Sequence, residues 1–397
     1  MHHRVLPTYA GIVPMAKHLE SLYVKNFRCL DELTIDRLGD VNLLVGGNNS
    51  GKTTVLEALE VFALKGLKAV LRYIASSHDE YNREVADELD ENDCVDIVEV
   101  LFNGRKFSDD ENEFIAIGEH AESNNLLKIA DTYYYTTHST KSHDDGDEIS
   151  IKKNIVRKNE LDSHKERSLK KAIRISYKQD AAFLPKSISG FMNCNFIPSN
   201  TFLNFGLAEQ LGGIAKDGEL SKVIKILQII HKDIEDIRTR TITIESKNNL
   251  LSDRISGFSP QSQTKTIIDV KVTSDPRYFP LKSMGEGVSR ILQIALHAYD
   301  AKDGILLIDE LENGLHYSIQ EKVWEWLFEL AKQYNMQIFA TTHSKDVIEN
   351  FNNVAQAREE EGILISLGRS RSGKLVSNPY SEEDLDVYVT TGMEVRG

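Results

Sequence analysis

The 397-residue sequence predicts an α/β fold in which a core with a mostly parallel sheet is split by an inserted lobe, itself antiparallel, β-rich and partly helical. Two observations support this class. Near both ends of the chain, short apolar runs alternate with stretches of helical periodicity, a pattern typical of parallel strands linked by helices. Between them, from Cys94 to about Tyr177, short strand-like runs follow one another without long helices, as in an antiparallel sheet.

The first part of the core is predicted from strands and helices in a regular order. Leu19–Phe27 and Leu33–Asp36 are rich in β-branched and aromatic residues and are expected to be strands. Val41–Val45 is apolar apart from Asn42 and is bounded by glycines, which indicates a central strand buried on both faces. Residues 52–64 have apolar side chains at helical spacing, and residues 66–90 are also predicted to be helical.

The predicted lobe consists of short strands separated by polar stretches. Its expected strands are Val95–Phe102, Glu113–Ile117, Leu126–Ile129 and Tyr133–Thr136. The polar stretch Ser139–Gly146 predicts a loop within an exposed tip that spans residues 139–170. Nine Lys or Arg residues lie in 152–174, where they indicate either a DNA- or partner-binding patch or, because acidic residues interleave with them, a solvated face.

After the lobe the alternation of strands and helices returns. An apolar strand is expected at Cys194–Pro198 and an amphipathic helix at 219–237. The remaining elements are a helix at 286–299, a strand at Ile305–Ile308, a helix at 318–334, a strand at Gln337–Ala340, a helix at 344–351 and a strand at Gly362–Ser366. The tail, 378–397, is interpreted as a closing strand or a docking segment.

These patterns divide the chain into four parts. In order they are a leader (1–18, with Met15 as an alternative start), the N-terminal part of the core (19–90), the inserted lobe (91–190) and the C-terminal part of the core (191–397). There is no run of 18 apolar residues and no signal-peptide pattern, so we expect no membrane span. Three widely spaced cysteines suit a reducing, cytoplasmic location, and a net charge of −14 argues against a general nucleic-acid coat.

The segment after the first buried strand has the pattern of a phosphate-binding loop. Gly46–Thr53 reads GGNNSGKT and matches GxxxxGK[ST] between a strand and a helix. Glycines allow successive backbone N–H groups to surround phosphate oxygens, and the helix N-terminus adds its positive dipole. The residues expected to bind nucleotide here are Gly46, Asn48, Asn49, Ser50, Gly51, Lys52, Thr53 and Thr54. Lys52 would reach the β- and γ-phosphates, and Thr53 would be a Mg²⁺ ligand.

Two further motifs follow buried strands in the second half of the core. Ile305–Ile308 ends in Asp309 and Glu310, where Asp309 would hold Mg²⁺ and Glu310 would orient or activate the attacking water. His343 follows the next strand and lies 34 residues beyond Asp309, where it could sense the γ-phosphate. We therefore expect ATP and Mg²⁺ as cofactors, with Lys52, Glu310 and His343 as the catalytic set.

A second glycine-containing turn precedes the helix at 286–299. Ser283, Gly285 and Glu286 stand at this helix start, which is again suited to an anion. One γ-phosphate does not need two such sites in a single chain. The expected use is therefore in trans, with these residues closing over ATP that is held by Lys52 of another copy; an ordinary capped loop is the alternative.

The order of these motifs resembles that of ABC-type ATPases of the SMC and double-strand-break-repair group, and within it the OLD-like AAA ATPases. The resemblance implies a split ABC-ATPase head in which Lys52 and Thr53 belong to Walker A and Asp309 and Glu310 to Walker B. It makes His343 the switch histidine, and residues 312–314 a D-loop that crosses to the partner. The chain departs from the family in its signature, KSMGE at 282–286, and in having no evident Q-loop glutamine after Pro198.

The resemblance also suggests a biological role. OLD-family nucleases carry a TOPRIM domain after the ATPase, but only 54 residues follow His343 here. The chain is therefore similar to the ATPase subunit of PARIS-type anti-phage systems. That similarity implies a homo-oligomeric scaffold, of dimer units or a hexamer, which regulates a separate TOPRIM-like or HNH nuclease until a phage-encoded trigger protein arrives. Two alternatives remain: a RecF-like repair ATPase that acts directly on DNA, and a scaffold whose ATP is structural.

Overall fold

The computed structural model describes most of the chain. The described residues are 17–80, 91–108, 110, 113–143, 146–156, 161, 163–164, 168–177, 180–183, 191–199, 206–244, 263–358 and 361–380. The leader up to residue 16, the end of the predicted helix after residue 80 and most of the tail 378–397 lie outside them. Within the described residues, no helix has the length and apolar character needed to cross a bilayer.

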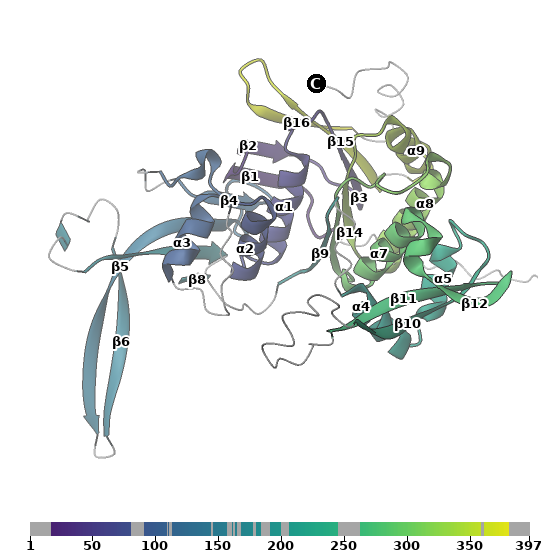
Figure 1. Cartoon of the computed structure of the whole chain (residues 1–397). Helices are drawn as coiled ribbons and strands as arrows, with labels where there is room; N and C mark the ends of the chain where they lie inside the picture. The colour runs from purple at the N-terminus through teal and green to yellow at the C-terminus, as the bar shows by residue number, and fades with distance from the viewer. Residues whose placement is uncertain are drawn as a thin grey trace, which may run out of the picture.

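The centre of the fold is a six-stranded, mostly parallel sheet (Figure 1). Its strands, in spatial order, are β16 (Leu375–Tyr380), β15 (Gly362–Arg369), β3 (Val41–Val45), β14 (Gln337–Thr341), β13 (Gly304–Ile308) and β9 (Asn193–Ile197). All neighbours pair in parallel except β15 and β16. The predicted α/β class is confirmed, and strands from both halves of the chain meet in one sheet.

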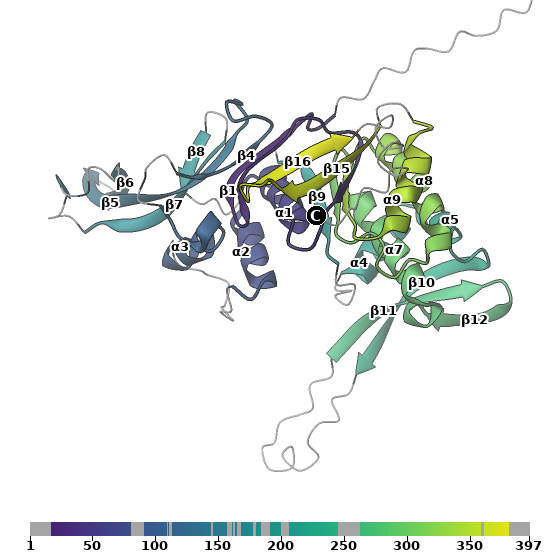
Figure 2. The same ribbon diagram turned by 90° about the horizontal axis from the view of Figure 1, so that it is seen from above.

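Helices cover both faces of this sheet because its strands are apolar on both sides. Within β3, Leu43 and Leu44 point to different hydrophobic clusters. One cluster includes α7 (Glu286–Asp300), α8 (Tyr317–Gln333) and α9 (Lys345–Ala355), and the other includes α1 (Lys52–Ala63) and α2 (Lys68–Ser77). Figure 2 shows α7, α8 and α9 together on one side, with α1 and α2 opposite them.

The second sheet is antiparallel and has seven strands. They are β1 (Leu22–Phe27), β2 (Leu30–Ile35), β4 (Ile115–Gly118), β5 (Leu127–His143), β6 (Gly146–Val156), β7 (Lys170–Tyr177) and β8 (Asp180–Phe183). β1 and β2, expected in the core region 19–90, pair with the lobe through β4. The domain boundaries themselves stay a prediction. Figure 1 shows β5 and β6 projecting as a two-stranded arm.

Two predictions for the lobe were wrong. The expected strand Val95–Phe102 is mostly helical: α3 spans Glu91–Glu99 and is followed by a turn and the short helix η1 (Asn103–Arg105). Val95, Val98 and Phe102 are buried at helical spacing, and this packing decides between two readings that an apolar run leaves open. The expected loop at Ser139–Gly146 is also mostly strand, because β5 continues to His143 and β6 begins at Gly146.

The amphipathic helix predicted at 219–237 ends early. α5 spans Leu220–Leu227, and from Ile234 the chain forms β10 (Ile234–Ile244) of a three-stranded sheet. Ile234 and Ile237 are buried on strand positions rather than on a helix face. The other elements here are α4 (Leu207–Lys216), β11 (Gln263–Val272), β12 (Asp275–Pro280) and the 3₁₀ turn η3 (Leu281–Met284). The sheet leads through η3 into α7.

Candidate functional site

The predicted phosphate-binding loop connects β3 to α1. Gly46 has φ 149° and Gly51 has φ 86°, and both are packed closely. A Cβ on Gly46 would lie 2.4 Å from the carbonyl oxygen of Leu367, so only glycine fits at this turn. Asn48 and Asn49, between them, are exposed at the tip of the loop. The loop is therefore a tight backbone turn that opens towards solvent at the start of a helix.

Lys52 begins α1 and folds back over the loop. Its ammonium donates hydrogen bonds to the carbonyl oxygens of Gly46 (2.9 Å) and Gly47 (3.0 Å). Burial lowers the pKa of Lys52, while the carboxylates of Asp309, Glu310 and Glu312 act in the opposite direction. A buried ammonium close to three carboxylates is the charge arrangement expected where a polyphosphate and a cation bind together.

Thr53 and Asp309 meet although 256 residues separate them. The Thr53 hydroxyl donates to both carboxylate oxygens of Asp309, at 3.2 and 3.3 Å. Asp309 follows β13, it is buried, and burial raises its pKa while the hydrogen bonds from Thr341 and Thr53 lower it. A hydroxyl and a carboxylate side by side provide the hard oxygen ligands that Mg²⁺ prefers. The two residues predicted to hold the metal therefore fit it.

Thr341 is part of this site, although the sequence analysis assigned it no role. Its hydroxyl donates to Asp309 Oδ1 at 2.6 Å and accepts from the backbone N–H of Glu310 at 2.8 Å. It lies at the end of β14, which pairs in parallel with β13, so the two strand ends are neighbours. Its place in the TTHS segment, directly after an apolar strand, was the signal that could have identified it.

The residues after Asp309 form a turn held by side chains. The Asn313 side-chain amide donates to Glu310 Oε2 at 2.8 Å and to the carbonyl oxygen of Ser199 at 3.0 Å. Glu312 accepts from the backbone N–H of His343 at 2.7 Å. His343 is exposed directly after β14 and so lies at the same edge of the sheet as Glu310. The structure therefore brings Lys52, Thr53, Asp309, Glu310 and His343 to one region, as predicted.

The Ser283 segment is separate from this group. Ser283, Gly285 and Glu286 are exposed around the start of α7, and the Ser283 hydroxyl donates to the carbonyl oxygen of Pro280 at 2.6 Å. Among the described residues, no hydrogen bond or ion pair joins them to the loop at 46–54. A Cβ on Gly287 would lie 2.9 Å from the carbonyl oxygen of Gly314. The α7 start thus packs against the turn that follows Asp309, with its own end open to solvent.

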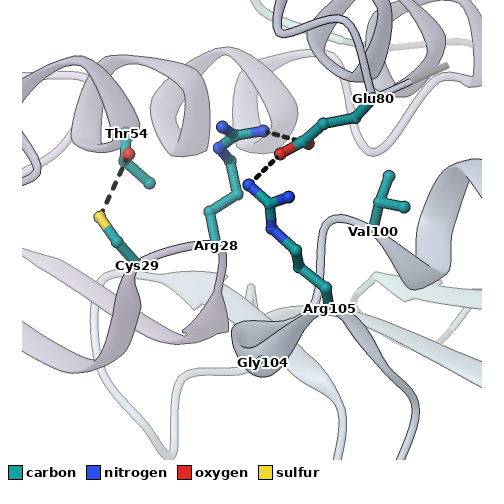
Figure 3. A pocket seen from close by; sticks show the side chains of 7 residues that line it. All are labelled: Arg28, Cys29, Thr54, Glu80, Val100, Gly104 and Arg105. Atoms are coloured by element: carbon teal, nitrogen blue, oxygen red, sulfur yellow. Dashed lines mark hydrogen bonds and ion pairs between the residues drawn. The ribbon is translucent and has the colours of Figure 1, made fainter.

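A cavity of about 290 Å³ lies beside the first turn of α1 (Figure 3). It is lined by Arg28, Cys29, Thr54, Glu80, Val100, Gly104 and Arg105. Glu80 binds Arg28 at 3.0 Å and Arg105 at 2.6 Å, and Arg28 also contacts the buried Glu57 at 3.1 Å. The members of this cluster come from four separate segments, so no local spacing in the sequence indicates it.

Comparison with known proteins places the chain in a family. Residues 41–349 match the family described as "AAA domain, putative AbiEii toxin, Type IV TA system". The chain belongs to this family. It is therefore an ATPase of the AAA type, and the matched region contains every motif discussed above.

The individual proteins similar to this AAA-family chain share little of its sequence, or match it over only a part of its length. An "ATP/GTP phosphatase" of Helicobacter pylori is 21% identical over 393 residues, covering 93% of this chain and 97% of that protein. An uncharacterized protein, MJECL11, of Methanocaldococcus jannaschii is 35% identical over 114 residues, 29% of this chain and all of that protein. Among solved structures, an SMC head bound to the C-winged helix domain of ScpA has a TM-score of 0.43 at 14% identity, covering 92% of this chain and 98% of that one.

Proposed function

We propose that the chain binds ATP with Mg²⁺ at the loop 46–54 and hydrolyses it with Glu310 as the base. The contact between Thr53 and Asp309 is the observation that carries this proposal. It brings the end of the phosphate-binding loop to the end of β13, where the two oxygen ligands would hold Mg²⁺. Bound there, the ion would neutralise charge on the β- and γ-phosphates.

The chain's own residues account for the remaining roles. The Lys52 ammonium would leave the carbonyls of Gly46 and Gly47 for the phosphate oxygens, which are stronger acceptors because they are charged. Glu310 would accept a proton from water as the water oxygen attacks the γ-phosphorus and the bond to the β-phosphate oxygen breaks, giving ADP and phosphate. Asn313 supports this role because it holds the Glu310 carboxylate at the site.

We place the nucleoside part of ATP in the cavity beside Thr54. Its volume of about 290 Å³ suits a base and a ribose, and Thr54 belongs both to the loop and to the cavity wall. Arg28, Glu80 and Arg105 supply donors and acceptors around it, as Figure 3 shows. These donors and acceptors do not select one pattern of hydrogen-bonding groups on a nucleobase. The cavity is therefore compatible with either ATP or GTP.

We further propose that ATP is enclosed between two copies of the chain and that the assembly regulates a separate nuclease in anti-phage defence. The exposed Ser283, Gly285 and Glu286 support the first part, since they offer a helix start to a phosphate that their own chain does not bring to them. The second part rests on the resemblance to OLD-like and PARIS-type ATPases and on the toxin–antitoxin wording of the family description.

The purified chain tests both parts. We expect it to hydrolyse ATP and to cleave neither DNA nor RNA with Mg²⁺ or Mn²⁺, and we expect protection from phage in cells to need a second protein. Lys52→Ala and Glu310→Gln serve as controls for contaminating activity. Cleavage by the lone wild-type chain that is lost in both variants would instead indicate a self-contained nuclease. DNA-stimulated hydrolysis with a steep salt dependence would favour the RecF-like alternative.

A further inference from the structure

Arg290 is fully buried in α7 and contacts the ends of two strands. Its side chain is 0% exposed. One terminal nitrogen donates to the carbonyl oxygens of Asp309 (2.8 Å) and Glu310 (3.2 Å), and the other donates to the carbonyl oxygen of Pro198 (3.1 Å) and to the side chain of Gln293 (3.2 Å). One guanidinium thus connects α7 to the chain just after β13 and just after β9.

A positive charge at this buried position has an unfavourable free energy of desolvation. Burial of Arg290 lowers its pKa to about 10, although the carboxylates of Asp309, Glu312 and Glu310 act in the opposite direction, so the group is still a cation at neutral pH. In the described part of the chain its acceptors are backbone carbonyls and one amide oxygen, and its Nε atom has no partner. A buried cation without a directly bonded carboxylate destabilises a fold relative to an apolar side chain of similar size. Packing alone therefore does not account for an arginine here.

The backbone that Arg290 holds is in an unusual conformation. Glu310 has φ 49°, in the left-handed region that residues with a Cβ rarely adopt. Its carbonyl oxygen accepts from Arg290 and from the N–H of Asn313 at 3.1 Å, while its own N–H donates to Thr341. These bonds fix the peptide groups on both sides of the Glu310 Cα, and so fix the direction in which its carboxylate leaves the strand.

The same arginine lies one turn from the exposed start of α7. Glu286, the first residue of the helix, is four positions before Arg290. Glu286 and Gly287 also pack against Gly314, in the turn that contains Asn313. A shift of the helix start would therefore move the guanidinium together with the strand ends that it holds.

We propose that Arg290 is a positioning residue for hydrolysis, which sets the backbone of Glu310 and links its carboxylate to the state of the α7 start. This inference rests on the proposed function, because it assumes that Glu310 acts on water at a bound nucleotide. The hydrogen bonds of the buried Arg290 guanidinium go to protein groups, so we assign it no direct contact with the reacting atoms. Its effect is exerted through the carbonyl groups of Asp309 and Glu310.

The test is a double-mutant cycle in steady-state ATP hydrolysis. Arg290→Met removes the donors and keeps an unbranched side chain of similar length. We expect kcat to fall roughly 100-fold, the size of effect that a misplacement of about 1 Å can have. The KM for ATP should stay within about threefold, because Lys52 and Thr53 are untouched. In the Glu310→Gln background the same substitution should lower kcat by less than about twofold, since the group it positions is already missing.

Two variants separate positioning from stability. His297→Leu breaks another polar contact of α7, from His297 to Asn195 on β9 at 3.2 Å, and should leave kcat within about twofold. Arg290→Lys keeps the charge but cannot reach all three carbonyls, and should give an intermediate kcat. If Arg290→Met does not fold, Arg290→Lys carries the same cycle.

Each outcome decides one question. An unchanged kcat in the Arg290 variant used, or an equal fold-loss with and without Glu310, would overturn the inference while the proposed function stands. A wild-type chain that binds no ATP, or binds it without any turnover, would overturn the proposed function itself. The two failures are distinguishable because wild-type binding and turnover are measured before any Arg290 variant.

Discussion

The side-chain amide of Asn313 donates a hydrogen bond to Glu310 Oε2 at 2.8 Å, and the same amide reaches the carbonyl oxygen of Ser199 at 3.0 Å. The resemblance to ABC-type ATPases implies that Asn313 belongs to a D-loop that crosses to a partner, and this stays a prediction. Within one chain, Asn313 lies between the ends of β13 and β9 and holds the carboxylate of Glu310 from one side. In the proposed mechanism, the other carboxylate oxygen would accept a hydrogen bond from the attacking water.

Replacing Glu310 by Gln should separate ATP binding from hydrolysis. The amide can still accept from Asn313, but it cannot accept a proton from water, so we expect turnover to fall roughly 10²- to 10⁴-fold. ATP should remain bound, and larger assemblies should accumulate with ATP but not with ADP. Hydrolysis assays combined with light scattering measure both effects. A variant with wild-type turnover would show that the base is another group.

Replacing Lys52 by Ala should abolish activity with little effect on the fold. The ammonium that would bind the β- and γ-phosphates is lost, and we expect turnover to fall at least about 100-fold. In the described part of the chain, the Lys52 ammonium donates to two carbonyls of its own loop, and its burial already disfavours its charged form. Hydrolysis and thermal melting should be measured on the same sample. Loss of turnover that is accompanied by a large drop in melting temperature would point to unfolding instead.

Mixing two inactive variants tests the shared ATP site. Ser283→Asp places a carboxylate where a γ-phosphate of the other copy is expected, and Lys52→Ala disables the loop. Each variant alone should be inactive. A one-to-one mixture forms dimers in which one site combines Lys52 of one chain with Ser283 of the other, and should recover about a quarter of wild-type turnover. Ser289→Ala, further along α7, is the matched control. A mixture as inactive as its components would argue that Ser283 acts within its own chain.

Much of the core could be predicted because its signals are local. The short, mostly apolar segment Val41–Val45 favours a buried strand because glycines flank it, and the glycines at 46 and 51 mark the turn that follows. The α3 segment was wrongly predicted because Val95, Ile97 and Val98 satisfy both a strand and a helix pattern. Packing against β7 and α2 decided the outcome, and this packing is not encoded in the spacing of α3 itself.

The candidate site, like the fold, could be predicted only where local sequence patterns report on it. Lys52, Thr53 and Asp309 belong to motifs whose spacing reflects their chemistry, so they could be named as candidates from the sequence. Arg290 belongs to no such motif. It could have been suspected only as a basic residue on the apolar face of its helix, beside Ile291 and Ile294. Its role depends on carbonyl groups that the fold brings together from Pro198 and Asp309, and no pattern of side chains in the sequence reports on backbone acceptors.

A last prediction concerns Glu60, which lies on α1 behind the phosphate-binding loop. Burial, together with the nearby carboxylate of Glu57, raises its pKa from 4.5 to about 7, and its buried Oε2 atom has no hydrogen-bond partner among the residues that the structure describes. Between these two values the folded chain binds more protons than the unfolded chain. The free energy of unfolding should therefore fall as pH rises from about 4.5 to about 7. Above pH 7 this decrease in stability should be complete.

Glu60→Gln should remove this dependence, because the amide resembles the protonated acid and does not ionise. At pH 8 the variant should be more stable than the wild type by on the order of 3 kcal/mol, and near pH 4.5 the two should be equal. Urea unfolding at both pH values measures the difference, with the exposed Glu325→Gln as a control that should follow the wild type. Equal stability of Glu60→Gln and wild type at pH 8 would show that Glu60 is ionised without cost, and that water or a partner group reaches its carboxylate in solution.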